Sequence, residues 1–219
     1  MEINFRYLLV ALLVYLLAVP FAFDLQLLPH GIIRATGFSA LLAIGIVSLR
    51  NSGRIFRISI AIVVAGIVLN ILDAINGEPV FFLGSMLLIL AFLILTTFAS
   101  MRQIAVDNVI STNRIVGAIC VYLLLGVMWS VSYALLEFAL PGSFSGIAVE
   151  AGSNWSPDWI YYSFVTLTTV GYGDMLPLTH SARALSYIET IFGQFYIAIL
   201  VAGLVSAYLA SKQETTRED

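Results

Sequence analysis

The sequence predicts an all-α membrane protein with six transmembrane helices and one short helix that enters the membrane and returns. Composition is the first observation: 60% of the 219 residues are hydrophobic and only 11% are charged, whereas a soluble domain has about 25% charged residues. The second is that six apolar runs come close to the length of about 20 residues that a spanning helix needs. The third is a short helical stretch, bounded by turn signals, between the last two runs.

The six runs are joined by short connections over the first half of the chain. They cover residues 5–23, 32–49, 55–75, 80–98, 115–140 and 182–210. The first run is too long, and its flank too poor in small residues, for a cleavable signal peptide. We therefore expect it to remain as a signal anchor.

Basic residues gather in alternate connections, and acidic residues in the others. The basic set is Arg6, Arg50, Arg54, Arg57, Arg102, Arg114, Lys212 and Arg217. Because positively charged loops stay in the cytoplasm, both termini are expected to be cytoplasmic. The sequence thus predicts a multi-pass protein of the cell membrane, surrounded by the lipid bilayer.

Charge and residue chemistry exclude several functions. The net charge is -3 and no dense Lys/Arg cluster is present, so a nucleic-acid partner is not expected. Cys120 is the one cysteine, and no Cys/His spacing suggests a metal site or a cofactor. An intramembrane enzyme would need paired catalytic groups, but Glu189 is the only deep acid in the last two runs and has no recognisable catalytic partner. We therefore expect that the protein is not an enzyme.

The chain divides by content into four parts. Residues 1–100 hold four closely spaced spans, and residues 101–114 are more polar with one apolar face, typical of a helix at the cytoplasmic interface. Residues 115–210 hold the last two spans and the loop between them. Residues 211–219 form a short tail, so no soluble ligand-binding domain is expected.

The loop between the last two spans contains a helix start signal. Ser156 can cap a helix, Pro157 suits the first turn, and Asp158 favours the positive end of the helix dipole. The helix that follows, DWIYYSFVTLTT, would be about 18 Å long at 1.5 Å per residue. Because that is too short to cross a bilayer, it must enter and return on the same side, buried in protein.

After this half-helix, the TVGYG segment (residues 169–173) must return in extended form. Gly171 and Gly173 permit backbone angles that are forbidden to other residues. Alternating such angles can turn successive carbonyl groups toward one side, where a column of them replaces the water shell of a potassium ion. Since one strand supplies only one wall, this chemistry needs several chains around an axis.

At these residues the chain resembles the tetrameric potassium channels. Residues 169–174, TVGYGD, reproduce the family signature, and the similarity runs through YYSFVTLT, Pro177, Arg183 and Gly193. The resemblance covers residues 115–210 and implies a pore domain of outer helix, re-entrant pore helix, selectivity filter and inner helix. It also implies a homotetramer with four-fold symmetry, and K⁺ as the permeant ligand.

The resemblance also implies a role for individual residues. K⁺ would bind at Thr169, Val170, Gly171 and Tyr172, and Gly173 would shape the mouth. Support for the filter would come from Asp174, Thr168, Tyr161, Tyr162 and Glu189. The inner helix would supply the hinge Gly193 and the cavity residues Gln194, Ile197, Val201, Val205 and Leu209, for which packing against the fifth span is the alternative.

Two positions depart from the family pattern. Tyr161 and Tyr162 stand where many relatives have tryptophans, and Val165 stands where some have a carboxylate behind the filter. Glu189, about two turns into the sixth span, could be a neutral acid bonded to Ser130 or Tyr133 of the fifth span. It could instead brace the pore helix through Ser163 or Thr166, in place of the support that Val165 cannot give.

The first four spans resemble a voltage-sensor domain without its gating charges. Residues 80–100 contain no basic residue, so this helix would move no charge through the membrane field. Arg34 and Asp73 lie at similar depths and could form a fixed bridge. We therefore expect that voltage does not gate the channel in the conventional way.

The leading hypothesis is a potassium-selective channel that conducts passively. The alternatives are a weakly selective cation channel, or a pore subunit of a potassium uptake transporter. The sequence leaves open the opening stimulus (lipid, tension, protons at His180 or His30, or constitutive leak), the conductance and rectification, and the role of Glu189. It also leaves open whether the first four helices pack on their own pore or on a neighbour's.

Overall fold

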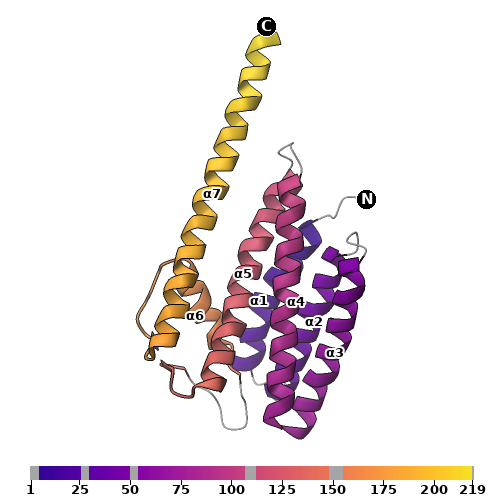
Figure 1. Ribbon diagram of the computed structural model, residues 1–219, viewed down its shortest axis with the longest axis vertical. Coiled ribbons are helices and arrows are strands. Elements are labelled where there is room, and N and C mark those ends of the chain that lie inside the picture. Colours follow the sequence, from indigo (N-terminus) through magenta and orange to yellow (C-terminus); the bar gives the residue numbers. More distant parts are fainter. Residues whose placement is uncertain (1–4, 26–29, 50–53, 107–111, 148–154, 219) are drawn as a thin grey trace.

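The computed structural model describes residues 5–25, 30–49, 54–106, 112–147 and 155–218, which form seven helices and one small two-stranded sheet (Figure 1). The helices are α1 (Phe5–Asp24), α2 (His30–Leu49), α3 (Arg54–Asn76), α4 (Pro79–Val106), α5 (Thr112–Ala139), α6 (Asp158–Leu167) and α7 (His180–Glu218). Strands β1 (Phe144–Ser145) and β2 (Leu176–Pro177) pair antiparallel.

Among the described residues, five helices are long and apolar enough to cross a membrane: α1, α3, α4, α5 and the first part of α7. The second expected span coincides with α2, which has 20 residues, although several of its side chains, Arg34 among them, lie outside the described residues. The prediction of an all-α membrane protein is confirmed. The expected Arg34–Asp73 bridge lies outside the described part of the chain.

Helices α1 to α5 stand side by side, and α7 stands on the other side of α5, with its C-terminal part extending past the rest (Figure 1). The bundle core consists of residues at helical spacing, such as Leu8, Leu12, Tyr15 and Val19 on α1. Their outward-facing neighbours are also apolar, Val10, Val14 and Leu17 among them. A helix that is apolar on all sides belongs in a membrane or a large core.

The structure differs from the expected interfacial helix over residues 101–114. Residues 101–106 continue α4, and residues 112–114 already belong to α5. No glycine or proline occurs between residues 85 and 106, so nothing interrupts helix propagation at the end of the apolar run. The described ends of this stretch therefore belong to α4 and α5, and residues 107–111 lie outside the described part of the chain.

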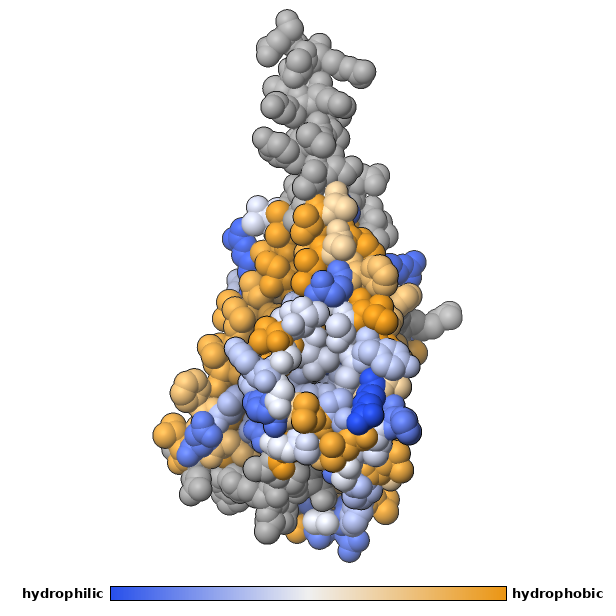
Figure 2. Space-filling model, turned by 90° about the vertical axis from the view of Figure 1, so that its left-hand side faces the viewer, coloured by the Kyte–Doolittle hydropathy of each residue, from blue (hydrophilic) through white to orange (hydrophobic). Residues whose placement is uncertain are grey.

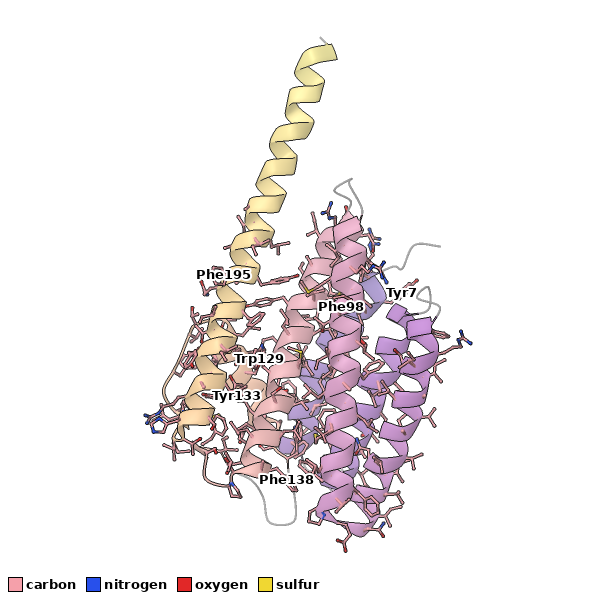
Figure 3. The ribbon with its side chains drawn as sticks, viewed as in Figure 1. Tyr7, Phe98, Trp129, Tyr133, Phe138 and Phe195 are labelled. Carbon is pink, nitrogen blue, oxygen red and sulfur yellow. The ribbon has the colours of Figure 1, made fainter. Side chains whose placement is uncertain are left out.

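Helices α1 to α4 form a four-helix unit. This unit packs on α5 of the same chain near both ends of α5. Near the start of α5, the backbone N–H of Phe5 donates to Asn113 Oδ1 at 3.0 Å. Near its end, the rings of Phe82 and Phe138 lie 5.0 Å apart; Figure 3 labels Phe138 there. In addition, the ring of Trp155, from the loop before α6, lies 5.7 Å from Phe23 and 5.3 Å from Phe38. Within one chain, the contacts therefore join the first four helices to the pore-like region.

Candidate ion-coordinating site

The short helix α6 begins at the predicted signal. Ser156 Oγ accepts a hydrogen bond from the backbone N–H of Asp158 at 3.2 Å, and the Ser156 carbonyl accepts from the N–H of Trp159 at 3.3 Å. The helix has ten residues, or about 15 Å at 1.5 Å per residue, so it cannot span a bilayer. It ends at Leu167, two residues before the end of the predicted stretch.

Two glycines allow α5 and α7 to approach α6 closely. A Cβ on Gly126 of α5 would lie 2.5 Å from the Phe164 ring, and a Cβ on Gly193 of α7 would lie 2.3 Å from the carbonyl oxygen of Leu167. The Leu167 carbonyl also accepts a hydrogen bond from the Tyr122 hydroxyl at 3.4 Å. The C-terminal end of α6 is thus packed between α5 and α7 through contacts that a methyl group would prevent.

The TVGYG segment follows α6 with an alternating backbone. Thr169, Gly171 and Gly173 have φ of 61°, 55° and 83°, whereas the intervening Val170 and Tyr172 do not have positive φ. Such an alternation of backbone angles is the one that the sequence predicts for this segment. Thr169 is the only non-glycine residue with positive φ in the described part of the chain, a conformation that costs an L-residue about 1–2 kcal/mol. The glycines were predicted to adopt such angles from the sequence, whereas Thr169 was not.

Hydrogen bonds tie the start of this segment to α6. The backbone N–H of Thr169 donates to the Thr166 carbonyl at 3.0 Å, and the N–H groups of Val170 and Gly171 donate to the Val165 carbonyl at 3.0 and 3.3 Å. The hydroxyl of Thr168 bonds back into α6 at Phe164. The first three N–H groups of the segment are therefore satisfied by carbonyl groups of α6.

The acid after the segment is held by a tyrosine of α6. Tyr161 donates its hydroxyl to Asp174 Oδ2 at 2.6 Å, and the N–H of Met175 donates to Oδ1 at 3.0 Å. The Tyr161 hydrogen bond lowers the pKa of Asp174 below its usual range. The Tyr161 ring also stacks on Tyr172, with centroids 6.4 Å apart and planes at 3°. Asp174, although exposed, therefore connects the outer end of the segment to α6.

The second tyrosine of the pair faces inward. Tyr162 is buried, and its hydroxyl lies 2.7 Å from Ser186 Oγ on α7. Its ring packs edge-on against Tyr133 of α5 and Phe144 of β1. Tyr161 and Tyr162 thus contact different partners, one at the outer mouth and one in the interior.

Glu189 is 0% exposed and lies behind α6. Its Oε1 is 2.5 Å from Ser163 Oγ, and its Oε2 contacts the Tyr133 hydroxyl. The other residue proposed from α5, Ser130, instead donates to the carbonyl of Val127 in its own helix. The sequence left open whether Glu189 contacts α5 or α6. In the structure it contacts both, through Tyr133 of α5 and Ser163 of α6.

The residues that were predicted to belong to the inner helix all lie on α7. Gly193 is buried against Leu167, and α7 continues through it as one helix. Gln194 donates from Nε2 to Thr169 Oγ1 at 3.5 Å, a contact with the start of the TVGYG segment that sequence reasoning missed. Ile197 and Val201 are exposed. Val205 and Leu209 belong to α7, but their side chains lie outside the described residues.

Part of the chain matches a known protein family. A family model described as "Ion channel" matches residues 115–210. That region contains α5, α6, the TVGYG segment and most of α7. This match and the helices long enough to span a membrane indicate a multi-pass membrane protein with an ion-channel domain. The matched family is a family of channels and not a class of enzymes.

Curated relatives are potassium channels. The chain is 38% identical over 93 residues to "Two pore potassium channel c" of Oryza sativa subsp. japonica, covering 42% of this chain and 18% of that protein. It is 34% identical over 102 residues to "Two pore potassium channel a" of the same plant, covering 46% and 26%. It is 31% identical over 98 residues to the human "A-type voltage-gated potassium channel KCND3", covering 42% and 14%.

Residues 115–210 are thus similar to the ion-channel family, and the relatives that match part of the chain are potassium channels. The chain spans only 14% to 26% of the length of these three relatives. No solved structure matches the chain.

Proposed function

We propose that this protein is a potassium-selective channel in which the TVGYG segment is the selectivity filter. The observation that carries the proposal is the alternating backbone of residues 169–173, in which Thr169, Gly171 and Gly173 have positive φ. Carbonyl groups turned to one side replace the hydration shell of K⁺ as it passes. The ion would bind at the carbonyls of Thr169, Val170, Gly171 and Tyr172, with Thr169 Oγ1 at the inner end.

Four copies of the chain would surround the ion. One segment supplies one wall only, and Val170 and Tyr172 are 52% and 72% exposed in the single chain. The surface beside them is also apolar, with Phe192, Phe195 and Ile199 of α7 exposed, and Figure 2 views the molecule from the side that carries α7. Contact with neighbouring copies would cover these side chains and complete a homotetramer.

The surrounding parts have supporting roles in this proposal. The C-terminal end of α6, which carries the negative end of the helix dipole, would point toward the cavity and stabilise a cation there. Gln194, Ile197, Val201, Val205 and Leu209 would line the cavity, and both termini would lie in the cytoplasm. In this proposal the four-helix unit is residues 1–100, the pore unit is residues 115–210 and the tail is residues 211–219.

The test replaces one glycine of the filter and one glycine outside it. Gly173 has φ of 83° and Gly142 has φ of 81°, and neither has an atom within 4 Å of an added Cβ. Gly173→Ala and Gly142→Ala therefore carry the same backbone cost, on the order of 1 kcal/mol per chain. Only Gly173 belongs to the proposed filter.

Ion flux from liposomes separates the outcomes. We expect the wild type to conduct K⁺ in preference to Na⁺ and to be blocked by Ba²⁺. Gly173→Ala should lose flux or selectivity, whereas Gly142→Ala should keep both. Equal and selective flux in the two variants would refute the filter assignment, and wild-type flux with no preference for K⁺ would indicate a weakly selective cation channel.

A further inference from the structure

Three helices meet at one buried hydroxyl behind the proposed filter. Ser163 Oγ of α6 lies 2.7 Å from the carbonyl oxygen of Gly126 on α5 and 2.5 Å from Glu189 Oε1 on α7. Glu189 Oε2 contacts the Tyr133 hydroxyl of α5; Figure 3 labels Tyr133 in the space between α5 and α7. Ser163, Tyr133 and Glu189 are all 0% exposed.

The number of protons in this cluster decides the charge of Glu189. Each of the three oxygen–oxygen contacts needs one proton between its two oxygens. Tyr133 and Ser163 carry one hydroxyl proton each, and the Gly126 carbonyl carries none. An ionised Glu189 would therefore leave one contact of Ser163, at 2.5 or 2.7 Å, with two lone-pair oxygens facing each other.

A protonated carboxyl group supplies the third proton. Tyr133 then donates to Glu189 Oε2, the Glu189 Oε1 hydroxyl donates to Ser163 Oγ, and Ser163 donates to the Gly126 carbonyl. Every oxygen of the cluster takes part in a hydrogen bond in this arrangement, as buried polar groups require.

In the described part of the chain, the surroundings of Glu189 contain no opposite charge to balance a negative one. The titratable groups near Glu189 are the phenols of Tyr122 and Tyr133 on α5 and of Tyr162 on α6. The Tyr162 hydroxyl is already 2.7 Å from Ser186 of α7. No cationic side chain is among the contacts of Glu189 in the described part of the chain, and burial without an opposite charge disfavours an ionised carboxylate.

We infer that Glu189 is held as a neutral carboxylic acid and that its proton fixes α6 between α5 and α7. In this role Glu189 is a positioning residue: it acts on the proposed filter through Ser163, six residues before Thr169 in the sequence. The inference rests on the proposed function only where it concerns the filter. The protonated cluster itself follows from the contacts.

A glutamine at this position keeps the hydrogen bonds of the neutral acid without its titratable proton. In Glu189→Gln the amide oxygen can accept from Tyr133 and the amide nitrogen can donate to Ser163, so all three contacts of the neutral cluster survive. These contacts can form in the variant whichever charge the native acid carries, because the Ser163 hydroxyl can turn toward the Gly126 carbonyl. Glutamine therefore tests whether a neutral group supports the cluster, and the infrared spectrum tests the protonation state itself. Glu189→Ala removes both contacts in either case and serves as the comparison.

The experiment uses the purified full chain in lipid. We expect an infrared carbonyl band of a protonated carboxylic acid in the wild type at neutral pH, and its loss in Glu189→Gln. The glutamine variant should keep the wild-type melting temperature, whereas Glu189→Ala and Ser163→Ala should show a lower one. If the protein conducts K⁺, selectivity should follow the same order.

Two results would overturn the inference: no protonated carboxyl band that disappears with Glu189, or a glutamine variant as destabilised as the alanine variant. A wild-type protein that does not conduct K⁺ would refute the proposed function alone. The infrared band and the melting temperatures would still decide the state of Glu189.

Discussion

Gly193→Ala is the substitution whose effect can be worked out most directly from the structure. A Cβ at this position would lie 2.3 Å from the Leu167 carbonyl oxygen and 3.0 Å from Leu167 Cδ1. An ordinary C···O contact begins at about 3.3 Å, so α7 and the end of α6 must separate by about 1 Å. The Leu167 carbonyl is two residues before Thr169, so this displacement reaches the proposed filter directly.

Two opposing terms determine how much the substitution changes the free energy of unfolding. Forcing an extra methyl group into a packed contact costs about 1–3 kcal/mol, and alanine regains about 1 kcal/mol of helix propensity over glycine. Because the nearest atom is a backbone oxygen at 2.3 Å that cannot rotate away, the upper part of the packing range applies, and we expect a net loss of about 1–2 kcal/mol per chain. The same cost would recur in every copy of a tetramer.

The measurement is thermal unfolding of the purified protein, together with K⁺ flux from liposomes. Gly203→Ala is the matched control, because Gly203 lies on the same helix and an added Cβ there meets no atom within 4 Å. We expect Gly203→Ala to be neutral or stabilising and Gly193→Ala to lower both stability and flux. Adding Leu167→Ala to Gly193→Ala should not restore stability or flux, because the atom nearest the new methyl group is the backbone oxygen of Leu167. Wild-type stability and flux in Gly193→Ala, or recovery in the double variant, would refute the reasoning and favour a hinge role alone.

Three further outcomes are expected. Currents in symmetrical K⁺ should show little intrinsic voltage dependence, because residues 80–100 carry no basic side chain and each moved charge contributes about 2.3 kcal/mol per 100 mV; a steep conductance–voltage curve would contradict this. Tyr161→Phe removes the donor to Asp174, so K⁺/Na⁺ selectivity measured from reversal potentials should fall, and an unchanged ratio would show that this bond does not support the mouth. Trp155→Ala should lower the free energy of unfolding by about 3–5 kcal/mol, since Trp155 is 1% exposed and packs on Phe23 and Phe38. Trp155→Phe should retain more of that stability, and equal stability of the two variants would count against ring packing as the cause.

The spans and the start of α6 could be predicted from the sequence because their causes are local. The length of an apolar run decides whether a helix can cross a bilayer, and Ser156 and Pro157 favour a helix start wherever they occur. The stretch over residues 101–114 shows the limit of such local signals, because its first residues continue α4 and its last residues belong to α5. Its apolar spacing is compatible with a surface helix and equally with the continuation of α4, and only the contacts of the folded chain distinguish the two.

The contacts behind α6 depend on how three helices approach one another. Sequence spacing gave four candidate partners for Glu189, and it could not choose among them because all four lie on helices whose rotation was unknown. In the same way, Gly126 and Gly193 look like ordinary helix glycines in the sequence. Only the positions of the Phe164 ring and the Leu167 carbonyl show why a side chain would not fit.

The packing of the four-helix unit also bears on how it could act. At the start of α5, Phe5 bonds to Asn113, and an added Cβ on Gly117 would lie 2.9 Å from the Phe5 ring. Toward the other end of α5, Phe82 packs on Phe138. A sensor that slid by one helical turn, about 5.4 Å, would have to break the contacts at both ends together. Because residues 80–100 contain no basic side chain, the membrane field would supply no work on this helix to break them. A fixed bundle that braces α5, and through Trp155 the start of α6, is therefore the role that this packing favours for the first four helices.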